Sequence, residues 1–277
     1  MFKPGDTHRV MRQFGIKADK NLGQNFLIEQ AALNQILAAA ELTSEDTVLE
    51  IGSGLGVLTS ALAVNVQDVI AVELDRRLLP ALEWNTREFN NVRIVHDDIL
   101  ALDLGELLGK QPYKVVANIP YNITSLLIRK LMEASTRADL VVLTIQREVA
   151  ERIVAQPGAM NILALSVQVY GDAEITARIP AGCFFPRPGV DSAVIRVRTY
   201  VEPLLAGDSV EAFFRLVRAG FSQKRKQLKN ALGSGLGFPD QDLLPLLESA
   251  GIRPSCRAQE LSLEEWITLT RSVTGAE

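Results

Sequence analysis

Short apolar runs alternate with amphipathic stretches between residues 29 and 200, and this alternation predicts the fold class. The apolar runs, rich in β-branched residues, cover 47–52, 68–74, 92–98, 114–118 and 138–145. Each run is followed by turn-forming residues and usually by a helical stretch. Near-continuous apolar strands separated by helices are typical of a parallel sheet covered on both faces. We therefore expect an α/β domain.

Two later runs complete the predicted sheet. Residues 174–180 and 192–200 are also strand-like, and the second alternates cleanly between apolar and polar residues, as an antiparallel strand would. A helix is expected over 161–171, just before them. The sequence thus predicts seven strands, mostly parallel, with the last one antiparallel.

The pattern turns helical after a linker at 201–209. One face of a helix that begins near residue 208 or 209 is predicted to carry Val210, Phe213, Phe214, Val217 and Phe221. Ser262 and Glu265 have the spacing of a capping box at the start of another helix. We predict a sheet domain over residues 1–200, including a basic N-terminal segment over 1–28, and a small helical domain over 201–277.

Composition narrows the class of protein. Hydrophobic residues make up 47% and charged residues 22% of the 277 residues, which is ordinary for a globular protein. No apolar run approaches the ~18–20 residues of a membrane span, and residues 1–20 lack the apolar core of a secretory signal. Cys183, Cys256 and two histidines show no metal-ligand spacing. We expect a cytoplasmic, monomeric protein without a metal or a membrane anchor.

The net charge of −4 hides a segregation of charge. Residues 212–239 contain six basic residues and no acidic one; these are Arg215, Arg218, Lys224, Arg225, Lys226 and Lys229. Residues 1–28 add five Lys and Arg residues against two Asp residues. A local excess of positive charge attracts phosphate. Solvated helix faces are the alternative interpretation.

A glycine-rich turn follows the first strand. Gly52, Gly54 and Gly56 allow a tight turn and a close approach of the backbone to a ligand. The dinucleotide-binding fingerprint needs glycine at position 57, where the chain has Val57. A G-x-G-x-G turn preceded by an acid, here Glu50, is instead typical of S-adenosylmethionine-dependent methyltransferases. A glycine-rich turn that binds nothing stays open as an alternative.

Polar side chains end the next three strands. Glu73 can accept hydrogen bonds from two ribose hydroxyls, and Asp98 can accept one from an adenine amine. Asn118 ends the fourth strand. Since the carboxyl ends of parallel strands meet at one edge, Gly52 and these three residues are predicted to line one crevice. A helix cap or a solvated loop is the alternative for each carboxylate, and Asp97 ranks below Asp98.

The motif Asn118-Ile119-Pro120-Tyr121 suits chemistry on an adenine amine. The lone pair of that amine is delocalised into the ring. The Asn118 side-chain oxygen and the Ile119 carbonyl can accept its N–H bonds and localise the lone pair toward a methyl group. Pro120 restricts Ile119, and Tyr121 offers a face for base stacking, worth about 1–3 kcal/mol. Catalysis would be mainly positioning. A strand-ending turn with an asparagine cap is the alternative.

A second aromatic pair, Phe184 and Phe185, precedes the prolines Pro186 and Pro188 before the last strand. An enzyme that acts on a base must take the base out of its stack, which explains a need for two rings. Either ring fits a base-stacking clamp, and both fit a hydrophobic core; the spacing leaves this open.

These motifs together resemble the KsgA/RsmA family of ribosomal RNA adenine dimethyltransferases over nearly the whole chain. The matching segments are KNLGQNFL (20–27), EIGSGLGVLT (50–59), NIPYNITS (118–125), QREVAERI (146–153), FFPRPGVDSAV (184–194) and FSQKRKQLKNAL (221–232). Ser53 stands where the family often has proline, and NITS replaces the more usual NIST; neither change removes a side chain used below. Without the resemblance, residues 22–27 would be an ordinary turn before a helix.

The resemblance implies a Rossmann-like methyltransferase domain with S-adenosylmethionine as cofactor. It implies methylation of N6 on two adjacent adenosines near the 3′ end of small-subunit rRNA, in a pre-ribosomal particle. The implied cofactor contacts are Asn25, the Leu27 backbone, Gly52, Gly54, Glu73, Asp98 and Asn118. It also assigns base stacking to Phe184, acceptor and stacking roles to residues 118–121, and rRNA binding to the six basic residues of 212–239.

Three other functions are alternatives. The macrolide-resistance methyltransferases share the asparagine motif but modify large-subunit rRNA; GLGVLT and the extended tail favour the small-subunit family. A ribosome-assembly factor that acts mainly by binding is disfavoured by the intact Glu73, Asp98 and Asn118. A nicotinamide oxidoreductase is disfavoured by Val57.

Overall fold

The computed structural model describes residues 2–205 and 207–275, and these divide into two units. The first unit contains the chain up to Ala150 together with Ala173–Thr199, and the second contains Glu151–Asp172 and the chain from Tyr200 onward. The sequence placed its boundary one residue later, and it assigned 151–172 to the first domain. Residues 162–168 form a helix that packs against the helix over 208–221, which explains why this segment joins the second unit.

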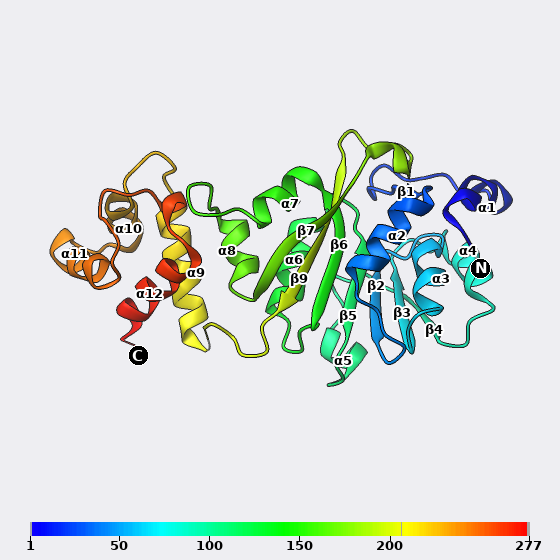
Figure 1. Ribbon diagram of the computed structural model, residues 1–277, viewed down its shortest axis with the longest axis horizontal. Coiled ribbons are helices and arrows are strands. Elements are labelled where there is room, and N and C mark those ends of the chain that lie inside the picture. Colours follow the sequence, from blue (N-terminus) through cyan, green and yellow to red (C-terminus); the bar gives the residue numbers. More distant parts are fainter. Residues whose placement is uncertain (1, 206, 276–277) are drawn as a thin grey trace. The chain divides into compact units, whose positions relative to one another are not determined.

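The first unit is built on a seven-stranded sheet, as predicted (Figure 1). Its strands are β2 (Thr47–Ile51), β3 (Asp68–Glu73), β4 (Val92–His96), β5 (Lys114–Asn118), β6 (Leu140–Gln146), β7 (Gly171–Ile179) and β9 (Ser192–Thr199). Their order across the sheet is β4-β3-β2-β5-β6-β9-β7. The first five in chain order pair in parallel, and β9 is antiparallel to β6 with Val142 opposite Arg196. The antiparallel last strand is therefore confirmed.

Helices cover both faces of this sheet. They are α2 (Gln30–Ala39), α3 (Val57–Ala63), α4 (Leu79–Thr86), α5 (Leu104–Leu108) and α6 (Thr124–Glu133), while α1 (Thr7–Gln13) belongs to the N-terminal segment. The chain moves outward from β2 to β4 and then returns to β5 and β6, so right-handed crossovers place α3 and α4 on one face and α5 and α6 on the other. α2 packs against α3. All five residues of β2 are buried, which fits a strand covered on both faces.

A separate two-stranded ribbon joins the N-terminal segment to the loop before β9. β1 (Phe26–Leu27) pairs antiparallel with β8 (Phe184–Phe185), so the predicted turn over 22–27 ends in a short strand. Helix α7 (Arg147–Ile153) leaves β6 and leads into the second unit.

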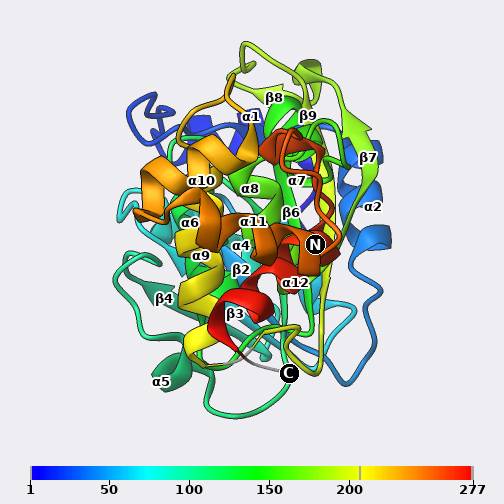
Figure 2. The same ribbon diagram turned by 90° about the vertical axis from the view of Figure 1, so that its left-hand side faces the viewer.

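The second unit is helical (Figure 2). It contains α8 (Ile162–Gln168), α9 (Asp208–Phe221), α10 (Leu228–Leu236), α11 (Asp240–Ser249) and α12 (Leu263–Thr274). α9 contacts α8, α10 and α12. Phe213 and Val217 are buried, as predicted, but Phe214 and Phe221 are only half-buried while Gly220 is fully covered. The buried surface is wider than one apolar stripe because α9 has neighbours on several sides.

The predicted capping box of α12 is confirmed. Ser262 Oγ accepts a hydrogen bond from the Glu265 backbone N at 3.1 Å, and Glu265 Oε2 accepts one from the Ser262 backbone N at 2.7 Å. Each residue satisfies a backbone donor that the first turn of a helix leaves without a partner.

Candidate active site

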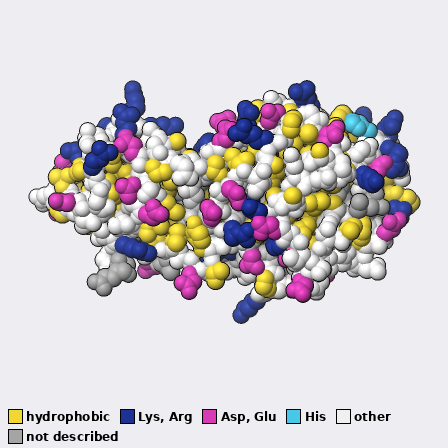
Figure 3. All heavy atoms as spheres, in the orientation of Figure 1, with side chains coloured by type: hydrophobic (Ala, Val, Ile, Leu, Met, Phe, Trp, Pro, Cys, Tyr) yellow, Lys and Arg dark blue, Asp and Glu magenta, His cyan; other side chains and the backbone are white. Residues whose placement is uncertain are grey.

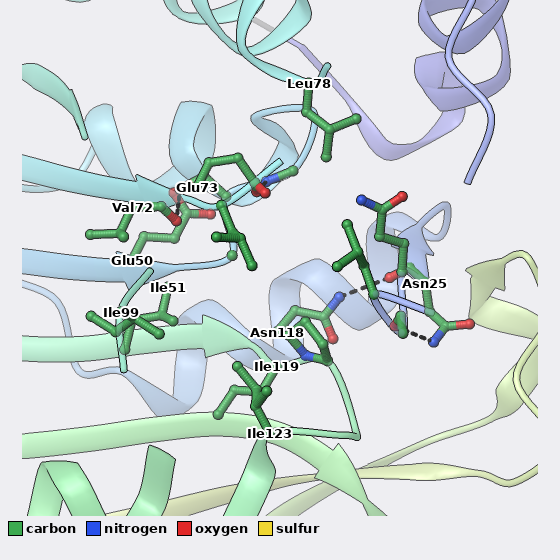
Figure 4. Close-up of a pocket in the computed structure, with 18 of the residues that line it drawn as sticks. Asn25, Glu50, Ile51, Val72, Glu73, Leu78, Ile99, Asn118, Ile119 and Ile123 are labelled. Carbon is green, nitrogen blue, oxygen red and sulfur yellow. Dashed lines mark hydrogen bonds between the residues drawn. The ribbon is translucent and has the colours of Figure 1, made fainter. Parts of the chain in front are cut away.

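A cavity of about 170 Å³ lies at the carboxyl ends of β2, β3, β4 and β5. It lies where the order of strands reverses, between β2 and β5, which is the ligand-binding position of open α/β sheets. Gly52, Glu73, Asp98 and Asn118 all line it, so the structure brings together the four strand ends that the sequence placed in one crevice. In Figure 4, Glu50 and Glu73 lie on one side and Asn25 and Asn118 on another.

The glycine loop is tied to the end of β3. Gly52 and Gly54 have φ angles of 72° and 58°, a left-handed conformation that side-chain-bearing residues rarely adopt. The Gly54 backbone N donates to Glu73 Oε2 at 2.7 Å, and the Asp75 backbone N donates to Glu73 Oε1 at 2.8 Å. A carboxylate has about four acceptor positions, so each oxygen can accept one more hydrogen bond from a ligand. Burial raises the pKa of Glu73.

Asp97 and Asp98 both line the cavity beside β4. Asp98 Oδ1 accepts from the Leu100 backbone N at 2.9 Å, while Asp97 Oδ1 accepts from the Asp98 backbone N at 2.7 Å. Lys130 of α6 holds this loop by donating to the Leu100 carbonyl at 2.9 Å. Both carboxylates therefore lie at the site.

The Asn118 amide has a defined orientation. Its Nδ2 donates to the Asn25 carbonyl at 3.0 Å, which turns Oδ1 away from that partner (Figure 4). Ile119 is buried, and its backbone N donates to the Thr144 carbonyl at 3.2 Å. The hydrogen bonds donated by Asn118 Nδ2 and by the Ile119 backbone N thus fix the end of β5. The Asn118 side-chain oxygen and the Ile119 carbonyl are the two acceptors that an adenine amine would need.

The Tyr121 ring is half-buried and anchored at its far end. Its hydroxyl lies 2.8 Å from Oγ of Ser192, a fully buried residue at the start of β9. Burial raises the pKa of Tyr121. The hydrogen bond ties the ring of the 118–121 motif to a different strand of the sheet.

The N-terminal segment forms part of the cavity wall. Asn25 and Leu27 both line the cavity. Asn25 Nδ2 donates to the Gly23 carbonyl at 3.0 Å. The Leu27 carbonyl accepts a hydrogen bond from Thr7 Oγ1 at 3.1 Å, so one acceptor position of that backbone group is already occupied.

Phe184 and Phe185 differ in burial. Phe184 is 2% exposed within the apolar core, whereas Phe185 is 37% exposed, with its ring centroid 4.4 Å from that of His8. Successive residues of a strand point to opposite sides, which places one ring of the pair inside and the other outside. Neither ring belongs to the described lining of the cavity, so base stacking by Phe184 stays a prediction.

The cavity is acidic. Its described lining contains four acidic side chains, those of Glu50, Glu73, Asp97 and Asp98, and no Lys, Arg or His. Glu50 is 1% exposed, and burial raises its pKa to about 8. A wall of this kind suits a cation and disfavours a phosphate-bearing ligand such as a dinucleotide. S-adenosylmethionine, with its sulfonium and ammonium groups, therefore fits the lining.

The six basic residues of 212–239 belong to the second unit. Arg215 and Arg218 lie on α9, Lys229 lies on α10, and the other three lie between these helices. All are exposed except Lys229, which is half-buried. Within the described chain none of them takes part in an ion pair with an acidic side chain. Their charges are available to a partner.

The described residues contain neither a metal-binding cluster nor a membrane-spanning helix. No cluster of three or more His, Cys, Asp or Glu side chains could hold a metal ion. None of the described helices combines the length and the apolar character needed to cross a membrane.

The sequence interpretation missed several residues that support the site. They are Thr7, Gln24, Asp75, Arg77 and Ser192. Asp75 and Arg77 could have been suspected from their place directly after Glu73 in VELDRR. Gln24 and Ser192 lie inside the matched segments 20–27 and 184–194. No local pattern shows that Ser192 bonds to Tyr121.

Fold and site define a methyltransferase with a Rossmann-like sheet, and solved structures support this class. The chain is similar to the 23S rRNA methyltransferase ErmE, with a TM-score of 0.75 and 27% identity, covering 90% of this chain and 100% of that one. It is also similar to a dimethyladenosine transferase from Plasmodium falciparum, with a TM-score of 0.77 and 27% identity, covering 88% and 95%.

Sequence comparison identifies the family. The model of the ribosomal RNA adenine dimethylase family matches residues 15–274. A ribosomal RNA small subunit methyltransferase A from Dehalococcoides mccartyi strain 195 is 48% identical over 258 residues, covering 93% of this chain and 89% of that protein. The protein of the same name from Lachnoclostridium phytofermentans is 38% identical over 275 residues, covering 96% and 95%. The chain belongs to the ribosomal RNA adenine dimethylase family, which confirms the predicted resemblance.

Proposed function

We propose that this protein transfers methyl groups from S-adenosylmethionine to N6 of two adjacent adenosines near the 3′ end of small-subunit rRNA. The products are N6,N6-dimethyladenosines, and the substrate is a pre-ribosomal particle on which the protein acts as a cytoplasmic monomer. Family membership supports adenine dimethylation, and the names of the relatives support the small subunit. The observation that carries the chemistry is the orientation of the Asn118 amide at the edge of an acidic cavity.

The cavity walls supply the contacts that this cofactor needs. The Gly52–Gly54 turn lets the backbone approach the cofactor closely. Glu73 and Asp98 line the cavity, where Glu73 would accept hydrogen bonds from the ribose hydroxyls and Asp98 would accept one from the cofactor's adenine amine. The N-terminal segment adds Asn25 and the Leu27 backbone. When bound, the cofactor supplies an electrophilic methyl group.

Asn118 and Ile119 act on the target base. Asn118 Oδ1 and the Ile119 carbonyl accept the N–H bonds of the adenine amine, which localises the lone pair of N6 toward the methyl group. The methylated nitrogen then loses a proton to water, so no strong base is needed. Pro120 fixes the turn, Tyr121 stacks on the base, and Phe184 is the residue to which the family resemblance assigns a second stacking contact.

Large-subunit rRNA is the second candidate substrate, favoured by the likeness to ErmE at 27% identity. The higher identity to the relatives named for the small subunit favours the first candidate. The six basic residues of 212–239 provide phosphate contacts for either RNA, so they do not separate the two.

Nucleoside mass spectrometry and primer extension test the proposal. Small-subunit and large-subunit particles that lack adenine dimethylation are incubated with the protein and S-adenosylmethionine. We expect dimethyladenosine at two adjacent positions of small-subunit rRNA, and modification of large-subunit rRNA alone would refute the assignment. Asn118→Ala should abolish transfer while retaining most RNA binding, whereas Asn34→Ala, an exposed asparagine on α2, should be fully active. Retained turnover in Asn118→Ala would contradict the acceptor role.

A further inference from the structure

The N-terminal segment Asp19–Asn25 contacts the catalytic loop along one side. The Asn25 carbonyl accepts the hydrogen bond from the Asn118 amide. Gly23 packs so closely that a Cβ there would lie 3.3 Å from Pro120 Cβ and 3.0 Å from Asn122 Oδ1. The position of this segment therefore affects which way the Asn118 side chain faces.

The other side of the same segment is fastened to the loop after β3. Gln24 Nε2 donates to Asp75 Oδ2 at 2.7 Å, and Gln24 Oε1 accepts from the Asp19 backbone N at 2.8 Å. Arg77 Nη2 donates to Asp75 Oδ2 at 2.7 Å and to Asp19 Oδ2 at 3.1 Å. We call these four residues, Asp19, Gln24, Asp75 and Arg77, the clasp.

The clasp is built on a buried acceptor. Asp75 is 7% exposed, and hydrogen bonds from Arg77 and Gln24 hold its pKa below the ordinary value. Charged groups strengthen such hydrogen bonds. The Asp75 backbone N also donates to Glu73 Oε1, so the clasp continues directly into the residue expected to hold the ribose. One segment thus connects the cofactor side of the cavity to the catalytic asparagine.

We propose that Gln24 and Asp75 are positioning residues, which hold the Asp19–Asn25 segment over the cavity and thereby orient the Asn118 amide. This inference rests on the proposed function for its catalytic consequence. If the clasp opens, the Asn25 carbonyl no longer fixes Nδ2 of Asn118. The amide can then rotate and present a donor, rather than an acceptor, to the target amine. Cofactor contacts of the same segment weaken together with it.

A donor–acceptor exchange tests the clasp. Gln24→Glu places a second carboxylate against Asp75, and the double variant Gln24→Glu with Asp75→Asn restores a hydrogen bond in the reverse direction. Loss of a hydrogen bond to a charged group corresponds to about a 10-fold effect. We expect Gln24→Glu to weaken S-adenosylmethionine binding, measured by calorimetry, and to lower kcat at saturating cofactor, each by about 10-fold. The double variant should recover part of both losses, because Arg77 Nη2 also donates to Asp75 Oδ2 and loses that acceptor in Asp75→Asn.

Amide hydrogen exchange over residues 19–25 of the cofactor-free protein gives a readout independent of catalysis. Exchange should accelerate in Gln24→Glu and in the milder Gln24→Ala, and should return toward wild type in the double variant. Gln30→Ala is the matched control, because Gln30 also donates through Nε2 to a side-chain oxygen, that of Asn34 at 2.9 Å, outside the cavity. Thermal unfolding of each variant verifies that it is folded.

The outcomes separate the two proposals. Unchanged exchange and unchanged cofactor binding in Gln24→Glu would overturn the clasp, as would losses that the double variant fails to rescue. A kcat that is unaffected at saturating cofactor would overturn the effect on Asn118. Failure of the wild-type protein to methylate rRNA would instead refute the proposed function, while the exchange and binding measurements would still decide whether the clasp exists.

Discussion

Glu50 is an acidic residue buried in the wall of the cavity. It belongs to β2, is 1% exposed and lies in the cavity wall. Neither its Oε2 nor Thr59 Oγ1 has a hydrogen-bond partner among the described residues. Burial, together with the nearby Glu73 carboxylate, raises the pKa of Glu50 from 4.5 to about 8. The carboxyl group is therefore mostly neutral near pH 7 in the protein without cofactor.

This raised pKa makes stability depend on pH. Between pH 4.5 and pH 8 the unfolded chain releases the Glu50 proton while the folded protein retains it, so the free energy of unfolding falls as pH rises. Each pKa unit corresponds to about 1.4 kcal/mol, so the total effect is of the order of a few kcal/mol. Glu50→Gln should flatten this part of the curve, as measured by urea unfolding from pH 5 to pH 8.

Glu73 also contributes to the pH dependence of the free energy of unfolding. Its pKa is also raised by burial, so some decrease with pH remains in Glu50→Gln. Parallel stability curves for the wild type and the variant would show that Glu50 is charged in the folded protein and would contradict the prediction.

Some site residues could be predicted from sequence because each follows a strand. Glu73, Asp98 and Asn118 come directly at or after β-branched runs, and the rule that parallel strands meet at one edge brings them together. Gln24 and Ser192 were missed because their partners lie 51 and 71 residues away in the chain. A hydrogen bond over such a distance depends on the finished fold and leaves no local pattern.

Strands and helices could be predicted where the local pattern of apolar and polar residues marks them. All seven strands of the sheet lie at the expected positions, because β-branched apolar runs mark them. The β1–β8 ribbon was missed, since it consists of two two-residue strands whose pairing depends on tertiary structure. Residues 151–172 were predicted to belong to the first domain but lie in the second unit. The reason is the same, because the contact between α8 and α9 also depends on tertiary structure.

The contact of α9 with α12 depends on a glycine in the middle of a helical segment. A Cβ at Gly220 would lie 2.5 Å from Cη2 of Trp266, a fully buried ring, and 3.2 Å from Leu228 Cδ1. Phe221 stacks on the same indole with ring centroids 5.8 Å apart. Close packing of the two helices therefore requires the absence of a side chain at position 220.

Gly220→Ala should destabilise the protein, although alanine favours a helix by about 1 kcal/mol over glycine. Overpacking of a well-packed core costs about 1–3 kcal/mol, and the buried indole has little room to move. After the gain in helix propensity is subtracted, chemical denaturation should show a net loss of up to about 2 kcal/mol, or a separate earlier transition of the helical unit. An increase in stability would mean that helix propensity outweighs the contact with Trp266.

The whole chain is acidic, with a net charge of −4, although its expected partner is RNA. Basic and acidic side chains are interspersed on the face seen in Figure 3. The six basic residues of 212–239 lie on α9, on α10 and between them, without an acidic residue in the same stretch. RNA affinity is therefore expected to depend on this segment rather than on the total charge.

Salt dependence of RNA binding tests this expectation. Each phosphate contact adds about −0.7 to −0.9 to the slope of log K against log salt concentration. Replacing Lys224, Arg225 and Lys226 together by glutamine should reduce the magnitude of the slope by about 2–3. Lys110→Gln is the control, since this exposed lysine lies just before β5, at the amino ends of the strands and away from the cavity. An equal slope for the triple variant and wild type would show that RNA binds elsewhere on the molecule.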